Sequence, residues 1–262
     1  MNSLMQMVPW LTLSMMRPLG MLLLLPLFKG GAMGSSLIRN SLILVFALPI
    51  APIIKTMSID LTHQTVTEIV FLYSEELLIG LVLGFCAAIP FWAIDMAGFI
   101  IDTLRGASIS TILNPLMGLQ SSIFGMLFTQ ILSVLFLVSG GFNALLTALY
   151  HSYNVLPPNA PLSFNASILL FIQQQWHMML ELCMSFAMPA IVVMILVDVA
   201  LGLINRSVEQ LNVFFLSMPI KSVLVVFLLL VSMYFAFDHY FMKIQLFEKQ
   251  ISTLLQLWRG LY

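Results

Sequence analysis

Charged residues are scarce in this sequence. Lys and Arg together number 10 and Asp and Glu 11, so that only 8% of the 262 residues are charged, whereas a typical soluble domain has about 25%. Hydrophobic residues make up 61% of the chain, and the mean hydropathy is +1.05. A soluble fold of this length cannot remove so much apolar surface from water. The apolar surface must therefore contact lipid, other protein chains, or both. The net charge of −1 argues against a broad basic face for nucleic acid.

Groups that could carry chemistry are equally few. The two cysteines, Cys86 and Cys183, lie in apolar stretches without a Cys-x-x-Cys spacing, which predicts small buried residues rather than a disulfide or a metal site. The four histidines lie in different segments without ligand spacing, at His63, His151, His177 and His239. No Gly-x-Ser-x-Gly, His-Glu-x-x-His, Walker A or Gly-x-Gly-x-x-Gly motif is present. The sequence therefore predicts no catalytic residues, no cofactor and no metal, and a protein that is not an enzyme.

No sustained alternation of apolar and polar residues occurs either, so no strand is predicted. Six to eight helical segments are the natural count, and the predicted fold class is all-α, an integral membrane-type protein with broken apolar helices. The first apolar run, residues 1–28, contains Arg17 and Pro18 with no Lys or Arg before it, and we expect a retained helix there rather than a signal peptide. Residues 40–54 hold no charge but are too short, at about 1.5 Å per residue, for a hydrocarbon core of about 30 Å.

Charges delimit the middle of the chain. The uncharged run 77–94 is about the minimum length for a span, and the charges at Asp95, Asp102 and Arg105 predict its end and a loop. Residues 123–138 form a helix candidate that a Ser-Gly-Gly step ends.

Prolines and charges also delimit the last third of the chain. Residues 151–165 contain three prolines and predict a loop, after which a long helix begins near Ala166. A mixed stretch ends at Pro219, Lys221 opens the last apolar run, and residues 243–262 are typical of an amphipathic surface helix. With six crossings the Lys and Arg residues divide five against four between the two sides, so there is no charge bias, and simple hairpin threading is not favoured.

Isolated charges inside apolar segments are informative because burying one in a membrane costs several kcal/mol. Asp95 and Asp102 are seven residues apart and share a helix face, and Asp102 and Arg105, three apart, can pair. Asp198 lies within a long apolar segment. These charges are consistent with interfacial helix ends, with an ion or proton path, or with polar pairing between subunits, and the spacing leaves all three open.

Two uncharged features complete the pattern. Gly80 and Gly84, with Ala88 on the same face, let helix backbones approach closely and predict helix packing. The loop 106–122 is rich in Ser, Thr, Asn and Gly, holds no charged residue and follows the charged turn at Asp102 and Arg105. Irregular backbone is not tolerated in contact with lipid, so this loop must lie outside the bilayer or be lined by protein or water.

Several short motifs follow one another in a specific order. They are Glu76-x3-Gly80-x3-Gly84, Pro90-Phe91-Trp92, Gly98, Asp102-x2-Arg105-Gly106, Asn114-Pro115, Gln210-Leu211-Asn212-Val213-Phe214, Ser217, Pro219 and Lys221. In this order and spacing they resemble the FliR/SpaR family, the T-type (SctT) inner-membrane component of the type III secretion export apparatus, over nearly the whole chain. The Phe91-Trp92 pair and the Ser139-Gly140-Gly141 step resemble injectisome members more than flagellar ones.

This resemblance implies a function and a set of partners. Family members form a helical assembly with P-like (SctR/FliP-type) and Q-like (SctS/FliQ-type) subunits, whose central pore conducts unfolded protein substrates across the bacterial inner membrane. The further partners implied are a U-like switch protein (SctU/FlhB-type), a V-like cytoplasmic ring protein and a needle or rod adaptor, with no nucleic acid. A multi-pass inner-membrane location is implied, with much of the assembly on the periplasmic side. Within one domain, 1–262, residues 1–175 resemble the P-like subunit and 176–262 the Q-like subunit.

The resemblance also implies roles for residues. A pore plug, centred on Asn114 and Pro115, is implied at Gly106, Ala107, Ser108, Ile109, Ser110, Thr111, Ile112, Leu113, Asn114, Pro115, Leu116, Met117, Gly118, Leu119, Gln120, Ser121 and Ser122. The loop base and family motif comprise Glu76, Asp102, Arg105, Asn212, Pro219 and Lys221. The residues alone also allow a stand-alone secondary transporter or channel, motivated by Asp95, Asp198 and the broken helices, although the sequence has no visible inverted repeat to support it.

Overall fold

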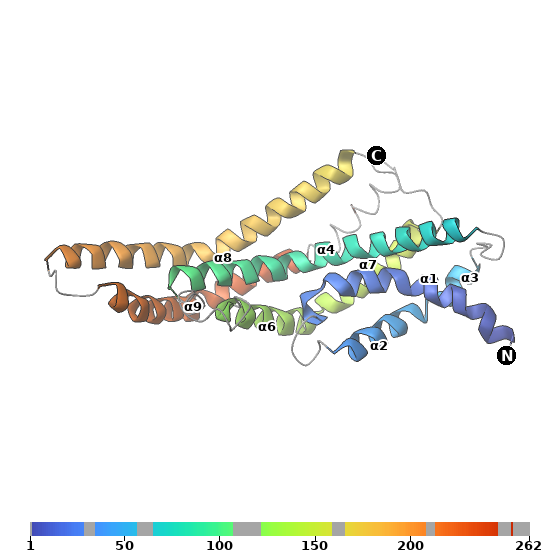
Figure 1. Ribbon diagram of the computed structural model, residues 1–262, viewed down its shortest axis with the longest axis horizontal. Coiled ribbons are helices and arrows are strands. Elements are labelled where there is room, and N and C mark those ends of the chain that lie inside the picture. The colour runs from blue at the N-terminus through green and yellow to red at the C-terminus, as the bar shows by residue number, and fades with distance from the viewer. Residues whose placement is uncertain are drawn as a thin grey trace. The chain divides into compact units, whose positions relative to one another are not determined.

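The computed structural model describes residues 2–28, 35–56, 65–106, 122–158, 166–207, 213–245 and Thr253. These residues form eight α-helices and one 3-10 helix and contain no strand (Figure 1). The all-α, membrane-type prediction is thereby confirmed. In chain order the elements are α1 (Asn2–Leu24), η1 (Pro26–Phe28), α2 (Ser36–Ala47), α3 (Ala51–Thr56), α4 (Val66–Leu104), α6 (Ile123–Val138), α7 (Gly141–Val155), α8 (Ala166–Ser207) and α9 (Val213–Gln245).

Local sequence signals explain where several helices begin. Glu68 accepts a hydrogen bond from the Thr65 backbone N–H at 2.8 Å, one half of a capping box at the start of α4. Ser122 accepts from the Gly125 N–H at 2.8 Å, which is the N-cap contact of α6. Gly140 separates α6 from α7 with a φ of 82°, a conformation that favours glycine because it has no Cβ.

The predicted loop at Asp95 was wrong, because α4 continues through Asp95 and Asp102 to Leu104. The acidic side chains do not interrupt the helix because they lie beside the N-terminus of α6. Asp102 accepts the Phe124 N–H there, and a Cβ added to Gly125 would lie 2.5 Å from Asp95 Oδ1. Carboxylates are favourable at a helix N-terminus, and α4 can therefore extend past both of them.

Two other predicted boundaries were also wrong. Helix α7 continues to Val155, so the first residues of the predicted loop 151–165 are helical. Ser152 and Tyr153 in this part are buried, and their packing holds the helix until the prolines that follow. Pro219 lies inside α9 rather than at its start, which membrane-type helices tolerate when neighbouring groups satisfy the freed carbonyl.

Two helices in the described part of the chain are long and apolar enough to cross a membrane, α4 and residues Ile168–Ser207 of α8, and the broken pair α6–α7 makes a third if counted as one span. Helix α4 has 39 residues, so at about 1.5 Å per residue it is about 58 Å long, roughly twice a hydrocarbon core of about 30 Å. An untilted α4 must therefore extend well beyond the lipid.

The described residues form two compact units, and α4 and α8 each contribute to both. The first contains α1, η1, α2, α3, α4 up to Ile89, α7 and the start of α8 up to Trp176. In this unit α1 packs against α2 and α3. The Phe46 and Phe142 rings, from α2 and α7, lie 5.9 Å apart.

The second unit contains α4 from Pro90, α6, α8 from His177 and α9 up to Ile244. Its core includes a row of aromatic rings. The Phe128 ring of α6 lies edge-on to Phe186 of α8 at 4.9 Å, and Phe91 of α4 lies edge-on to Phe136 of α6 at 5.5 Å. Edge-to-face pairs of this kind add to the apolar burial that joins the helices.

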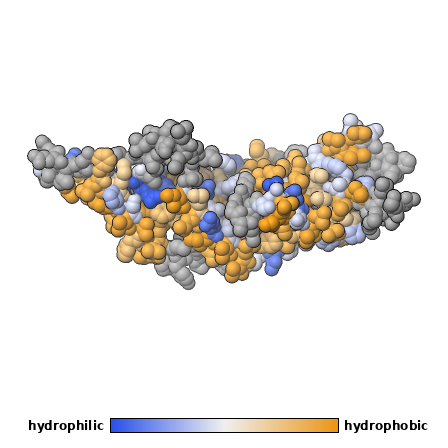
Figure 2. Space-filling view, turned by 60° about the horizontal axis from the view of Figure 1, so that its bottom comes forward, coloured by the Kyte–Doolittle hydropathy of each residue, from blue (hydrophilic) through white to orange (hydrophobic). Residues whose placement is uncertain are grey.

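Hydrophobic side chains dominate the face drawn in Figure 2, where hydrophilic residues form small islands. The most apolar 18-residue window of α4 is 67% buried, but that of α8 only 28%. Exposed side chains on α8 include Leu169, Met188, Leu196 and Leu203. A surface this apolar is suited to lipid or to other protein chains rather than to water.

Candidate functional site

The two ends of the predicted plug loop are joined by side-chain contacts in the second unit. Asp102 Oδ2 accepts from the Ser122 hydroxyl at 2.6 Å and from the Phe124 N–H at 3.0 Å. Helix α4 ends at Leu104 and α6 begins at Ile123. The Asp102 carboxylate therefore holds together the two helix ends between which the predicted plug loop lies.

Arg105 completes this base. Its Nε lies 2.7 Å from Asp102 Oδ1, so the pairing that the three-residue spacing predicts is present. The Arg105 guanidinium carbon lies 4.5 Å from the Phe124 ring centroid, a cation–π contact. The Asp102 side chain is only 8% exposed, and a partly buried pair of this kind is screened less by salt than a surface pair.

Lys221 of α9 also contacts this end of α4. Its ammonium donates to the Leu104 carbonyl at 3.2 Å and to Asp198 Oδ2 of α8 at 2.8 Å. Three helices of the second unit therefore meet at the residue that ends α4, two positions before Gly106.

Only some of the remaining predicted site residues are among those that the structure describes. Gly106 has a φ of 88°, and Ser122 caps α6. The plug residues between them, including Asn114 and Pro115, lie outside the described residues, as does Asn212. Pro219 is placed within α9, two residues before Lys221.

Two glycines allow α4 and α6 to meet closely near this base. A Cβ built on Gly98 would collide with the backbone of Gly125 and Phe124. A Cβ on Gly125 would lie 2.5 Å from Asp95 Oδ1 and 3.0 Å from the Asp95 carbonyl oxygen of α4. This close approach brings the N-terminus of α6 within reach of the Asp102 carboxylate.

Glu76, which the family motif includes, lies elsewhere, in the core of the first unit. It binds Arg17 through two hydrogen bonds, Nε to Oε2 at 2.5 Å and Nη2 to Oε1 at 2.8 Å. The Arg17 and Glu76 side chains are 0% and 2% exposed. This bidentate geometry is the strongest arrangement available to an Arg–carboxylate pair.

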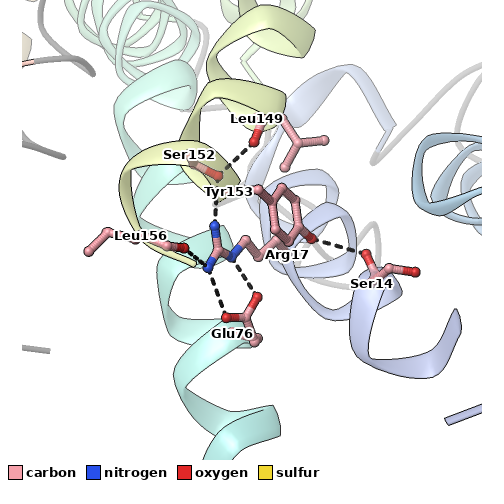
Figure 3. A network of polar contacts seen from close by, with 7 residues as sticks. All are labelled: Ser14, Arg17, Glu76, Leu149, Ser152, Tyr153 and Leu156. Atoms are coloured by element: carbon pink, nitrogen blue, oxygen red, sulfur yellow. Dashed lines mark hydrogen bonds and ion pairs between the residues drawn. The ribbon is translucent and has the colours of Figure 1, made fainter. Parts of the chain in front are cut away.

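Figure 3 shows the Arg17 guanidinium of α1 enclosed by groups from α4 and from the end of α7. Arg17 also donates to Ser152 Oγ at 3.0 Å and to the Leu156 carbonyl at 2.5 Å. Its guanidinium carbon lies 4.1 Å from the Tyr153 ring centroid, and the Tyr153 hydroxyl donates to the Ser14 carbonyl at 3.1 Å. A buried cation is stable only when paired and hydrogen-bonded in this way.

The same contact explains why Glu76, Gly80 and Gly84 recur at intervals of four. A Cβ on Gly80 would collide with the Arg17 backbone, and a Cβ on Gly84 would lie 2.5 Å from the Met21 carbonyl oxygen. Residues four apart share a helix face, so α4 presents a carboxylate to the Arg17 side chain and glycines to the α1 backbone. The two helices run in the same direction at this crossing, because the residue numbers of both increase together.

Sequence reasoning did not assign a role to Arg17. The available signal was its position as the single charge in an apolar run of 28 residues, because a charge in such a place requires an opposite partner. The partner could not be chosen from spacing, since Glu76 is 59 positions away.

The fold and these contacts define a helical membrane protein in which isolated charges join one helix to another. Among the described residues no three His, Cys, Asp or Glu side chains gather as possible metal ligands. The chain belongs to the bacterial export proteins, family 1, whose family model matches residues 8–246.

Similar proteins agree with this family. The secretion system apparatus protein SsaT of Salmonella typhimurium is 47% identical over 233 residues, which cover 89% of this chain and 90% of that protein. The Yop proteins translocation protein T of Yersinia pestis is 35% identical over 85% of this chain and 86% of its own length. The flagellar biosynthetic protein FliR of Bacillus subtilis is 32% identical over 61% of this chain and 62% of its own length.

Proposed function

We propose that this chain is a subunit of a type III secretion export gate. In this proposal it forms, with P-like and Q-like partners, the pore that conducts unfolded proteins across the bacterial inner membrane. The observation that carries it is the 47% identity, over 89% of the chain, to a secretion system apparatus protein. Identity to the flagellar relative is 32% over 61% of the chain, which favours an injectisome over a flagellar role.

The plug role of residues 106–122 is part of this proposal. Both ends of the segment are fixed at one carboxylate, Asp102, through Ser122 and the Phe124 N–H. A segment whose ends are held together and whose own residues 107–122 carry no charge is suited to block ion flow, because passing chains of any sequence find no strong binding groups on it.

Further parts of the proposal concern assembly and location. The apolar surface of α8 supports contact with neighbouring helices of the assembly as well as with lipid. A helix of 39 residues is about twice as long as the bilayer core is thick, which supports a complex that projects out of the bilayer, and the family resemblance implies the periplasmic side. The U-like switch protein, the V-like ring protein and a needle or rod adaptor complete the proposed set of partners.

The test is deletion of residues 110–118 in the chain co-expressed with its P-like and Q-like partners. We expect the complex to assemble and to conduct ions more readily across a planar lipid bilayer, because the segment no longer fills the pore. Replacing the same nine residues by a Gly-Ser sequence of equal length separates the loss of side chains from shortening. Unchanged conductance in both assembled variants excludes the plug role.

A stand-alone secondary transporter remains the alternative, and one contact weighs against it. Asp198, the carboxylate nearest to the middle of an apolar segment, is paired with Lys221, so it already has a structural contact between α8 and α9. Purification separates the two functions. A gate subunit is expected to be unstable in detergent without its partners, whereas a transporter is expected to be a stable monomer that binds a substrate.

A further inference from the structure

The last residue of α4 receives a cation from another helix. The Lys221 ammonium donates to the Leu104 carbonyl at 3.2 Å and lies 2.6 Å from Asp198 Oδ1. The Lys221 side chain is 11% exposed, whereas that of Asp198 is 55% exposed. Lys221 is therefore enclosed and oriented, and its counter-ion remains accessible at the surface of the chain.

A cation at this place has a specific physical effect. The last four carbonyls of a helix lack partners within it, and they form the negative end of the helix dipole. The Ile101 and Thr103 carbonyls accept from the Arg105 and Gly106 N–H groups, both at 3.1 Å. The Leu104 carbonyl accepts from Lys221 instead, directly before the chain leaves the helix.

We propose that Asp198 is a positioning residue that acts through Lys221 to hold the end of α4 from which the segment 107–121 departs. A lysine side chain is flexible and turns its ammonium toward water when it can. The Asp198 carboxylate keeps the ammonium on the Leu104 carbonyl and neutralises its charge. The consequence for ion leakage rests on the gate function proposed above, whereas the contact with α4 does not.

The competing explanation is that the pair only joins α8 to α9. The structure offers a substitution that separates these explanations, the charge exchange D198K/K221D. The exchange keeps an ion pair between the two helices, but it places a carboxylate beside the Leu104 carbonyl, where a donor is needed. It therefore keeps the bridge and removes the contact with α4.

The experiment measures hydrogen–deuterium exchange of the Arg105 and Gly106 amides and bilayer conductance, both in the assembled complex. Variants are K221M, which removes the donor, D198N, which removes the counter-ion, K221R, which keeps a cationic donor, and the charge exchange. E181Q is the matched control, since Glu181 is an exposed carboxylate on the same helix α8. We expect K221M and the charge exchange to raise amide exchange by about 2- to 5-fold, D198N to raise it less, and K221R and E181Q to leave it near the original value.

Three results overturn the proposal. If the D198K/K221D variant shows the same amide hydrogen exchange and the same conductance as the original chain, the pair serves only to join α8 to α9. If K221M leaves the Arg105 and Gly106 amides unchanged, Lys221 does not hold the end of α4, and if D198N leaves them unchanged, Asp198 does not position Lys221.

Conductance separates this proposal from the plug role. A leak in the 110–118 deletion but none in K221M, despite faster exchange, supports the hold of the pair on α4, shows that this hold does not control ion leakage, and leaves the plug role standing. No leak in the deletion rejects the plug role, and the exchange of the Arg105 and Gly106 amides then still decides whether Asp198 positions α4.

Discussion

The two units of this protein use charge in opposite ways. In the first, Arg17 and Glu76 are almost completely removed from solvent, and every contact of the guanidinium is to a group of the unit's own core. In the second, the pairs Asp102–Arg105 and Asp198–Lys221 both contact the C-terminal end of α4, and their side chains are 8% to 55% exposed.

The ion pairs of the two units therefore differ in how costly they are to open. A buried pair that is fully hydrogen-bonded is very costly to open, because each charge loses its partner while it stays out of contact with water. A pair at a helix end can loosen at a smaller cost because water replaces its contacts. The first unit is therefore built to keep one arrangement of α1, α4 and α7, whereas the second holds the base of a loop with contacts that can yield.

The largest expected effect comes from breaking the buried pair. R17M leaves the Glu76 carboxylate buried without a counter-ion, which we expect to lower the free energy of unfolding by about 3–5 kcal/mol. The measurement is the thermal unfolding midpoint of the purified complex, with the amount of chain retained in membranes. The double variant R17M/E76M removes both charges and is expected to recover part of the loss. A midpoint of R17M equal to the original would show that the pair does not stabilise the first unit.

A smaller effect is expected at the glycine contact between α1 and α4. G80A places a methyl group against the Arg17 backbone, which cannot move without displacing α1, and we expect a loss of about 1–3 kcal/mol. The matched control is G202A in α8, where an added Cβ meets nothing within 4 Å and should stabilise the helix by about 0.5–1 kcal/mol. Denaturant unfolding of the two variants compares them directly, and equal shifts of the same sign would contradict this account of the crossing.

A smaller loss of stability than for R17M or G80A is expected at the loop base, where Asp102 contacts Ser122 and Arg105. S122A removes the N-cap of α6 and one hydrogen bond to Asp102, for an expected loss of about 1 kcal/mol. We expect local opening rather than global unfolding, seen as faster hydrogen exchange of the Phe124 and Gly125 amides. S133A on the same helix removes only a bond from the Ser133 hydroxyl to the Thr129 carbonyl and is the control. Similar exchange in both variants would mean that Ser122 does not fix the start of α6.

The smallest expected effect is a difference between the two units in how amide exchange responds to salt. Raising ionic strength from 0.1 M to 1 M shortens the screening length from about 10 Å to about 3 Å. The Asp198–Lys221 pair, whose carboxylate is 55% exposed, should weaken, which we expect to raise exchange of the Arg105 and Gly106 amides by up to about 2-fold. Amides of α1 around Arg17 should not respond. An equal response in both places would remove the distinction between the units.

Several features of the fold could be predicted from the sequence because they depend on neighbours along the chain. The all-α class, the helix 123–138 with its Ser-Gly-Gly end and the start of a helix at Ala166 follow from composition, periodicity and turn residues. The Asp102–Arg105 pair follows from a spacing of three on one helix. The predicted end of the helix at Asp95 was wrong because the carboxylates contact α6, which the local sequence does not reveal.

Composition and pattern along the chain are enough to show that it is helical, that its surface is not suited to water, and that each isolated charge needs a partner. Which partner each charge has depends on how the helices pack. Arg17 meets Glu76 across 59 positions and Lys221 meets Asp198 across 23, because helix crossings bring them together. At the first crossing Gly80 also permits the backbones of α1 and α4 to approach. Long-range pairing depends on the angle and register of helix packing, which periodicity along one helix does not specify.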